Sequence, residues 1–235
     1  MTKLTIIEVN YGFWRILQTD RKKRITGQSE INVPHDVLRN PQKVAQLADK
    51  INIRGRFLIL LNTGAAVVRI GVGKDETESN FGDKYVYDEE FINGTRWTSA
   101  LPRDISDGLV EICSIMGIPS SRILTIDTLE YRMAEYFANA YKNESAMWLI
   151  LQQDPGIRII IMKNSAPSDC HYISNDPAYR MKELTGLWYN QKDLPEAVCL
   201  SCENCGWIRD FLLDKHVRII PDAKYDVIES WLKKQ

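Results

Sequence analysis

Three cysteines near the end of the chain have a spacing that could hold a metal. Cys199, Cys202 and Cys205 are separated from one another by two residues. Gaps of this length allow successive thiolates to converge on one zinc ion or iron–sulfur cluster, and Cys170 or His171 could supply a fourth ligand. However, Cys199 stands in an apolar, strand-like stretch, and free cysteine also packs readily as a small buried residue. We favour structural cysteines and keep a metal or iron–sulfur site as the alternative.

No other residues form a familiar catalytic set. The three histidines, His35, His171 and His216, are far apart in the sequence and lack metal-ligand spacing. The sequence has no Gly-x-Ser-x-Gly motif for a serine nucleophile, and no glycine-rich phosphate loop ending in Lys-Ser or Lys-Thr. An enzyme is therefore not expected.

Composition indicates an ordinary globular protein. The 235 residues carry 30 basic and 31 acidic side chains, a formal net charge of -1, so no global field attracts nucleic acid. No apolar stretch approaches the ~20 residues that span a bilayer, and the first residues do not resemble a signal peptide. These features, with an odd number of cysteines, predict a cytoplasmic protein. The basic run 21–24 is expected to be a solvated hairpin turn, with contact to a membrane surface as the alternative.

Hydrophobic patterning predicts alternating groups of strands and helices. In the first part we expect strands at 4–9, 13–18, 25–33, 57–61, 67–72 and 85–87, a polar loop at 74–84, and helices at 42–51 and 104–116. Asp127, with Glu130 three residues later, is expected to cap a helix that reaches about residue 142. In the second part we expect strands at 146–151, 157–162, 169–174 and 197–201, and helices at 176–189, 207–215 and 223–233.

The order of these elements repeats. Each half reads three strands, a helix, a strand and a helix, which is the order of a ribonuclease-H-like unit. The predicted fold is therefore α/β, with two tandem ribonuclease-H-like units that contain mixed sheets, as in actin-like ATPases. We place the first unit at 1–126, with a small insertion at about 73–103, and the second at 127–235.

This plan resembles the actin-like assembly proteins of type IV pili and type II secretion. Residues 115–119 and 123–127 resemble the end of a helix and the strand that precedes the helix linking the two halves of those proteins. The resemblance implies a non-catalytic scaffold that binds the cytoplasmic segment of an inner-membrane protein and is peripheral to the membrane through that partner. It also allows a homodimer and implies that nucleic acid is not a partner.

Actin-like ATPases hold phosphate with two Asp-x-Gly turns, and the resemblance places cofactor-binding positions at Asn10, Gly12, Asp154 and Gly156. Glycine permits close approach of the backbone, and the aspartate oxygen binds hydrated Mg²⁺. Here Asn10 replaces the first aspartate, and an uncharged amide is a poor Mg²⁺ ligand. The second turn keeps Asp154 and Gly156 but lacks the serine or threonine that should follow. The glycine pair expected near residue 202 is also missing, so we expect a degenerate site without a required cofactor, with weak binding of ATP and magnesium still open.

Aromatic residues stand beside the first turn. Phe13 and Trp14 occupy positions where small hydroxyl residues usually contact phosphate, and two rings would crowd a triphosphate. Trp14 and Trp97 each flank a turn-like segment. Because tryptophan is enriched at interface hot spots, we expect Phe13, Trp14 and Trp97 to contribute to a partner-binding surface.

Overall fold

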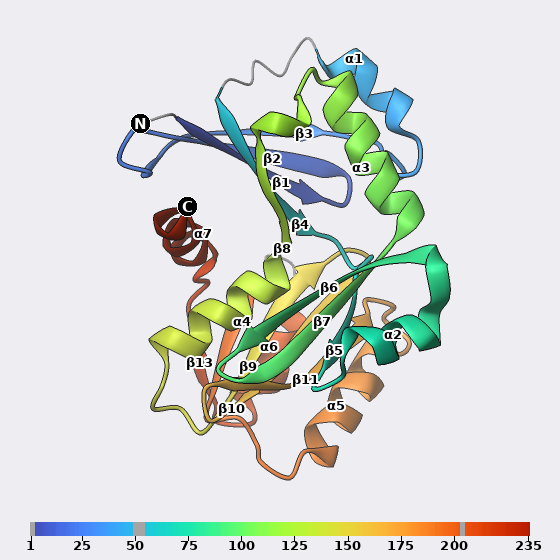
Figure 1. The fold of residues 1–235 in the computed structure, drawn as a ribbon. Helices are drawn as coiled ribbons and strands as arrows, with labels where there is room; N and C mark the ends of the chain where they lie inside the picture. The colour runs from blue at the N-terminus through green and yellow to red at the C-terminus, as the bar shows by residue number, and fades with distance from the viewer. Residues whose placement is uncertain (1–2, 49–54, 203–204) are drawn as a thin grey trace.

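The computed structural model describes residues 3–48, 55–202 and 205–235 and contains two five-stranded sheets with the same plan (Figure 1). The first sheet has the order β3-β2-β1-β4-β8, with β1 antiparallel to β2 and parallel to β4. Its strands are β1 (Leu4–Asn10), β2 (Phe13–Thr19), β3 (Ile25–Asn32), β4 (Arg56–Asn62) and β8 (Ile123–Thr128). The continuous apolar run of β4 is buried on both faces, as expected for a central parallel strand.

The second sheet repeats this arrangement with the order β11-β10-β9-β12-β13. Its strands are β9 (Ala146–Gln153), β10 (Gly156–Lys163), β11 (Ala166–Ser174), β12 (Ala197–Ser201) and β13 (Arg218–Ile220). Again a hairpin of antiparallel strands is followed by a crossover to parallel strands, β12 beside β9 and β13 beside β12. The predicted fold class, with two ribonuclease-H-like sheets, is confirmed.

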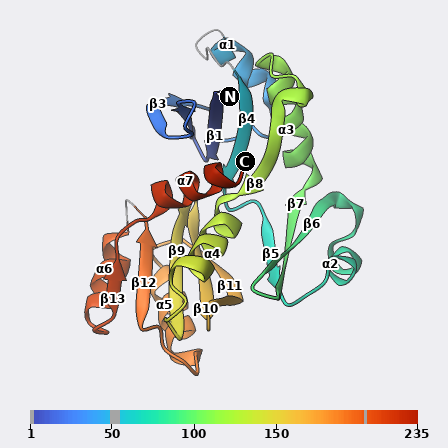
Figure 2. The same cartoon turned by 60° about the vertical axis from the view of Figure 1, so that its left-hand side comes forward.

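A third, three-stranded sheet has the order β5-β7-β6 and lies beside the second sheet in Figure 2. It consists of β5 (Val67–Ile70), β6 (Tyr85–Ile92) and β7 (Thr95–Pro102), and helix α2 (Lys74–Phe81) connects β5 to β6. The sequence interpretation missed both α2, expected as a loop, and β7. Helix α2 buries only Thr77 among its eight residues, so it carries no apolar stripe that could reveal it.

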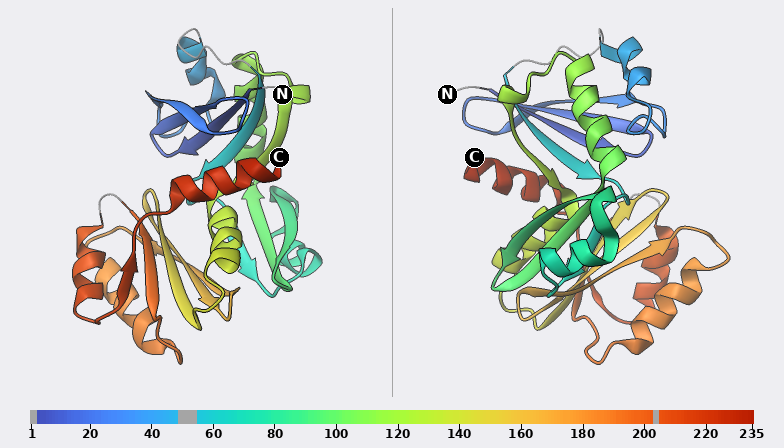
Figure 3. Two further views of the ribbon diagram at one scale, coloured as in Figure 1. Left: turned by 90° about the vertical axis from the view of Figure 1, so that its left-hand side faces the viewer. Right: turned by 45° about the vertical axis from the view of Figure 1, so that its right-hand side comes forward.

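Four longer helices and the shorter α6 cover the sheets. α3 (Arg103–Ile115) packs on the outer face of the first sheet, while α5 (Arg180–Asn190) and α6 (Gly206–Leu213) pack on the outer face of the second. α4 (Leu129–Ala140) and α7 (Lys224–Lys234) share one hydrophobic cluster with the facing sides of both sheets (Figure 3). No helix within the described ranges is long and apolar enough to cross a membrane.

Three helix starts differ from expectation, and the simplest case is α5, which begins at Arg180 and not at 176. α4 is capped by Thr128, whose hydroxyl accepts the backbone N–H of Tyr131, because β8 continues one residue beyond Asp127. The helix expected at 42–51 begins as a 3₁₀ turn, Pro41–Val44, and continues as α1 (Ala45–Ala48). The last residues of that predicted helix lie outside the described residues.

Candidate functional site

The two five-stranded sheets meet at the carboxyl ends of their parallel strands, where open α/β sheets bind ligands. β1 ends at Asn10 and β4 at Asn62, and β9 and β12 end nearby in the second sheet. A cavity of about 360 Å³, which we call the central cleft, opens between them. Its walls are formed by Asn10, Tyr11, Phe13, Arg15, Gln28, Asn62, Leu129, Gln152, Asp154, Ser201, Cys202, Asp222, Lys224 and Tyr225.

The structure therefore brings three predicted positions to one cavity: Asn10, Phe13 and Asp154. The first turn joins β1 to β2, and Gly12 has a φ of +87°, which favours glycine. A Cβ on Gly12 would also meet the ring of His35 at 2.7 Å. This turn is therefore shaped by backbone conformation and by ring packing within the protein.

The second turn is a tight hairpin. Asp154 and Pro155 connect β9 to β10, whose ends pair as Gln153 and Gly156. A Cβ on Gly156 would lie 2.4 Å from the carbonyl oxygen of Ile173 on β11, so this glycine is required by strand packing. The Asp154 carboxylate accepts a hydrogen bond of 3.3 Å from Gln152 Nε2.

A fully buried carboxylate lies under the central cleft. Glu8, on β1, is 0% exposed and forms ion pairs with Arg15 Nη1 at 3.4 Å and with Lys224 Nζ. Asn62 Nδ2 donates to Glu8 Oε1 at 3.2 Å and to Asn10 Oδ1 at 2.7 Å. The Asn62 amide is therefore hydrogen-bonded to both Glu8 and Asn10. The positive charges of Arg15 and Lys224 both neutralise the Glu8 carboxylate.

The last helix reaches across the cleft to the first sheet. Besides the Lys224 ion pair, the hydroxyl of Tyr225 donates a hydrogen bond of 2.5 Å to Gln28 Oε1 on β3. Lys224 and Tyr225 both lie in the first turn of α7. This helix therefore links the two five-stranded sheets at the mouth of the cleft.

The aromatic residues at the first turn divide between cleft and core. Phe13 is partly buried on the cleft wall, with the guanidinium of Arg15 at 5.7 Å from its ring centroid. Trp14 and Trp97 are each 1% exposed. Trp14 points inward from β2, so its interpretation as a partner contact is corrected: it is a core residue. Trp97, on β7, is equally buried but lines a second cavity, described below, so its role as a partner contact remains a prediction.

The three spaced cysteines do not converge. Cys199, on β12, faces the central hydrophobic cluster, whereas Cys205, at the start of α6, lies in the cluster on the other face of the second sheet. Cys202 and Cys205 are joined as a disulfide. Within residues 3–48, 55–202 and 205–235, no group of three or more His, Cys, Asp or Glu side chains could hold a metal. The alternative of a metal site at Cys199, Cys202 and Cys205 is therefore corrected.

A second cavity, of about 200 Å³, lies between the first sheet and the three-stranded sheet; we call it the groove. Its lining residues are Leu61, Ala66, Val86, Tyr87, Asp88, Glu90, Trp97, Ser99, Leu101, Ser106, Ile126, Asp127, Thr128 and Tyr131. Among them, only Trp97 was predicted from the sequence as a partner contact. Apart from Ala66, which follows β4, they come from β4, β6, β7, β8, α3 and α4. The groove is apolar at its base and acidic along its β6 side, where Asp88 and Glu90 lie.

Two strand edges border the groove. β8 is the last strand of the first sheet and β6 is the last strand of the three-stranded sheet, and no described strand pairs with the outer edge of either. On β6 the alternate residues Val86, Asp88 and Glu90 line the groove, while Ile126 and Asp127 line it from β8. Val86 and Ile126 are 40% and 42% exposed, which is high for aliphatic side chains.

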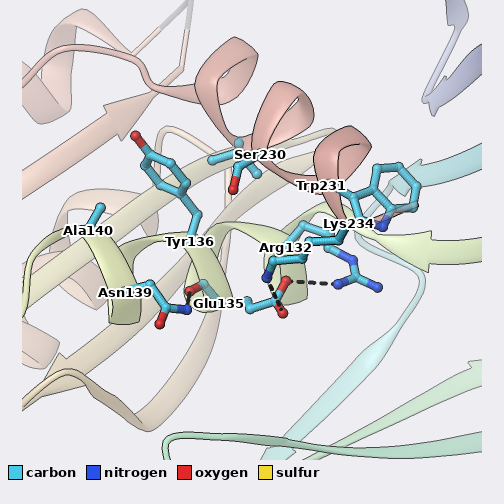
Figure 4. Close-up of a pocket in the computed structure, with 9 residues that line it drawn as sticks. Arg132, Glu135, Tyr136, Asn139, Ala140, Ser230, Trp231 and Lys234 are labelled. Atoms are coloured by element: carbon cyan, nitrogen blue, oxygen red, sulfur yellow. Dashed lines mark hydrogen bonds and ion pairs between the residues drawn. The ribbon is translucent and has the colours of Figure 1, made fainter. Parts of the chain in front are cut away.

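Asp127 links the groove to a chain of charges on α4 and α7. Arg132 Nε donates to Asp127 Oδ2 at 2.5 Å, and Arg132 Nη1 lies 2.8 Å from a Glu135 oxygen. Burial raises the pKa of Asp127 to about 6, although Arg132 acts in the opposite direction. Lys234 Nζ completes the chain at 2.7 Å from Glu135, as Figure 4 shows.

The charge chain also borders a third cavity, between α4 and α7, which measures about 360 Å³. In Figure 4, Tyr136 and Ser230 stand on its other side, away from the charges. The Arg132 guanidinium also lies 5.2 Å from the ring centroid of Trp231, a favourable cation–π distance. Since both of its cations pair with Glu135, this cavity offers no charged group free to hold a ligand, and we assign it a packing role.

No family model and no curated protein matches the sequence. Solved structures match in fold. A Bacteroides thetaiotaomicron protein described as having an actin-like ATPase fold and unknown function has a TM-score of 0.73 at 10% identity, covering 97% of this chain and 95% of that one. A structure described as the PilM-PilN type IV pilus biogenesis complex has a TM-score of 0.66 at 10% identity, covering 94% and 88%. The polyphosphate/ATP-glucomannokinase of Arthrobacter sp. strain KM has a TM-score of 0.52 at 12% identity, covering both chains fully. At these identities the likeness shows the fold alone: the chain has the actin-like ATPase fold.

Proposed function

We propose that this protein is a non-catalytic actin-like adaptor that binds, in the groove, the cytoplasmic segment of a membrane protein of a pilus or secretion machine. The observation that carries the proposal is the groove itself, where two strand edges without a described partner flank an apolar base and an acidic side. An extended peptide can add to such an edge through main-chain hydrogen bonds, while its alternate side chains enter pockets.

The chemistry of the groove favours a basic and apolar peptide. Asp88 and Glu90 present carboxylates beside the exposed aliphatic side chains of Val86 and Ile126, whereas the Asp127 carboxylate is paired with Arg132. Cytoplasmic segments next to membrane spans carry an excess of lysine and arginine and lead into apolar sequence. Such a segment matches the groove in both respects.

The central cleft supports the non-catalytic part of the proposal. A nucleotide triphosphate needs free cations and a metal held by carboxylate oxygen. Here Arg15 and Lys224 are committed to the buried Glu8, and the amide of Asn10 is committed to Asn62. Adding phosphate would therefore require the loss of interactions that hold the cleft together.

The similar structures are consistent with either a partner-binding or a phosphoryl-transfer role, because they include both a pilus biogenesis complex and a kinase. The pairing of the cleft cations with Glu8 supports the first role. The pilus complex is described with two proteins, which agrees with a role in binding a second protein.

The test uses a display library of random twelve-residue peptides panned on the intact chain. Enriched peptides should alternate apolar residues with lysine or arginine, and synthetic versions should bind in a 1:1 complex by calorimetry. Val86→Asp and Ile126→Asp should each reduce affinity at least tenfold, because they replace the exposed apolar side chains of the two bordering strands with charge. Phe91→Asp is the matched control, since Phe91 is an exposed apolar residue of β6 that does not line the groove.

Two results would contradict the proposal. One is that enriched peptides bind the Val86→Asp, Ile126→Asp and Phe91→Asp variants alike, which would place the contact elsewhere. The other is steady release of phosphate from Mg-ATP that disappears in an Asp154→Asn variant, which would make the central cleft catalytic.

A further inference from the structure

Positive side chains gather at the amino-terminal end of the parallel strands in the first sheet. Lys3 precedes β1, Arg56 begins β4 and Arg122 precedes β8. The strand register places Leu4 opposite Arg56 and Phe57 opposite Ile123, so the three cations follow one another along a single end of the sheet. All three are exposed.

The turn between β2 and β3 extends this row. The backbone N–H of Leu4 donates to the hydroxyl of Thr19 at 3.1 Å, which places residues 21–24 of the turn beside Lys3. The turn, the start of β1 and the starts of β4 and β8 lie at the same end of the sheet in Figure 1 and in the right-hand view of Figure 3. We call this surface the basic edge; it comprises Lys3, Arg21, Lys22, Lys23, Arg24, Arg56 and Arg122.

The charge of the basic edge is largely unneutralised. Asp20 is the acid of the turn, and its carboxylate lies 2.9 Å from the Arg24 guanidinium. The other six cations form no ion pair among the described residues. A concentration of positive charge of this kind is notable in a chain whose formal net charge is -1.

We infer that the basic edge is a docking surface for an anionic lipid bilayer. Clusters of four to eight lysine and arginine residues are attracted to anionic lipid headgroups by about 1 kcal/mol for each cation near the surface. Proteins that bind single-stranded nucleic acid usually add exposed aromatic side chains that stack on bases. The exposed aromatic residues of the described chain, Tyr11, Phe91, Tyr172, Tyr179, Tyr189 and Tyr225, lie on other elements. The chemistry therefore favours phosphate headgroups on a surface.

The position of the basic edge relative to the groove agrees with this inference. β8 begins at the basic edge with Ile123 and reaches the groove at Ile126. These positions are separated by roughly 10 Å along the strand, at about 3.3 Å for each residue. A peptide that leaves a bilayer at the basic edge could therefore enter the groove within a few residues. Lipid binding itself does not depend on the proposed peptide role, because the test contains no peptide.

The experiment measures sedimentation of the full chain with vesicles. Vesicles of phosphatidylglycerol and phosphatidylcholine should retain the protein, whereas vesicles of phosphatidylcholine alone should not. Retention should fall as salt rises, since the Debye length shortens from about 10 Å at 0.1 M to about 3 Å at 1 M. Neutralising Arg21, Lys22 and Arg56 by substitution with glutamine should weaken binding on the order of 100-fold, because each cation contributes about fivefold.

The matched control substitutes three exposed cations of the second half with glutamine, Lys182, Lys192 and Arg209, and should bind nearly as well as the wild type. All six positions are exposed, and thermal unfolding will verify that both variants remain folded. Equal retention on both kinds of vesicle would overturn the inference, as would an equal loss in both triple variants. Salt-sensitive binding to duplex DNA or RNA, without vesicle binding, would assign the basic edge to nucleic acid instead.

Discussion

The ammonium group of Lys224, near the start of the last helix, pairs with the carboxylate of Glu8 on the first strand. Glu8 is completely buried, and the Lys224 side chain is 12% exposed. The pair joins β1 of the first sheet to α7, the helix that follows β13 of the second sheet. It also occupies the part of the fold where a nucleotide's phosphates would need positive charge.

We predict that Lys224→Met lowers the free energy of unfolding by about 3 kcal/mol, at the lower end of the range for breaking a buried ion pair, because Arg15 still faces Glu8. Urea unfolding followed by fluorescence measures this change. The double variant with Glu8→Gln should recover most of the loss, since the buried carboxylate is gone and Arg15 keeps its ion pair with Glu30 at 3.6 Å. A loss below about 0.5 kcal/mol for the single variant would show that the pair is solvated and weak.

The second prediction concerns pH. Burial raises the pKa of Asp127 to about 6 in the folded chain, so folding favours the protonated carboxyl group. The resulting stabilisation is fully present below about pH 4 and is lost as the pH rises through 6. Each unit of pKa difference corresponds to about 1.4 kcal/mol. The free energy of unfolding should therefore be measured against pH for the wild type and for Asp127→Asn. The difference between the two should change between pH 4 and 6 and be constant above pH 6. A difference that is the same at every pH would refute the assignment.

The third prediction compares two glycines within helices. In α3 a Cβ at Gly108 would lie 1.7 Å from the backbone carbonyl oxygen of Leu38, so Gly108→Ala should cost 3 kcal/mol or more, above the ~1–3 kcal/mol usual for overpacking. In α5 a Cβ at Gly186 meets nothing within 4 Å. Gly186→Ala should therefore stabilise the protein by roughly 0.5–1 kcal/mol through better helix propensity. Midpoints of urea unfolding measure both changes, and similar effects at the two positions would contradict the packing of α3.

The fourth prediction concerns the cysteines. After mild reduction, native protein treated with iodoacetamide should be labelled at Cys202 but not at Cys205, which is only 5% exposed, as mapped by mass spectrometry. Cys113 and Cys199 should stay unlabelled until the chain unfolds, because burial raises their thiol pKa values to about 11 and about 12. Zinc added to the reduced protein should not bind in stoichiometric amount. Zinc retention that is lost in a Cys199→Ser variant would restore the metal hypothesis.

The sequence predicted the sheets well where each strand appears as a distinct apolar segment. The three hairpin strands followed by the apolar run 57–61 predicted the first sheet, and the same order predicted the second, because a buried parallel strand is a continuous apolar segment. Single tryptophans were less informative. Trp14 and Trp97 flank turns in the sequence, yet both point to the interior, and only the direction of the strand residues decides this.

The sequence predicted residues of the central cleft but not the groove, and the difference has a physical reason. Asn10, Phe13 and Asp154 could be placed in one cleft because each lies at or next to the end of a strand in a repeated unit. The groove could not be predicted, since Val86 and Ile126 meet only through the placement of a third sheet whose strand β7 was not recognised. Polar helices such as α2 remain difficult to identify because packing, rather than an apolar stripe, fixes them.

The pairing of Glu8 with Lys224 has a consequence for how the chain reaches its native state. The two residues are separated by more than two hundred positions, so this contact closes one of the longest loops in the protein, and such contacts slow folding. During synthesis the first sheet must assemble while its buried carboxylate has Arg15 but not yet Lys224. The amino-terminal half should therefore stay loosely organised until α7 docks, and docking of that helix should be the step that commits the whole chain to its final structure.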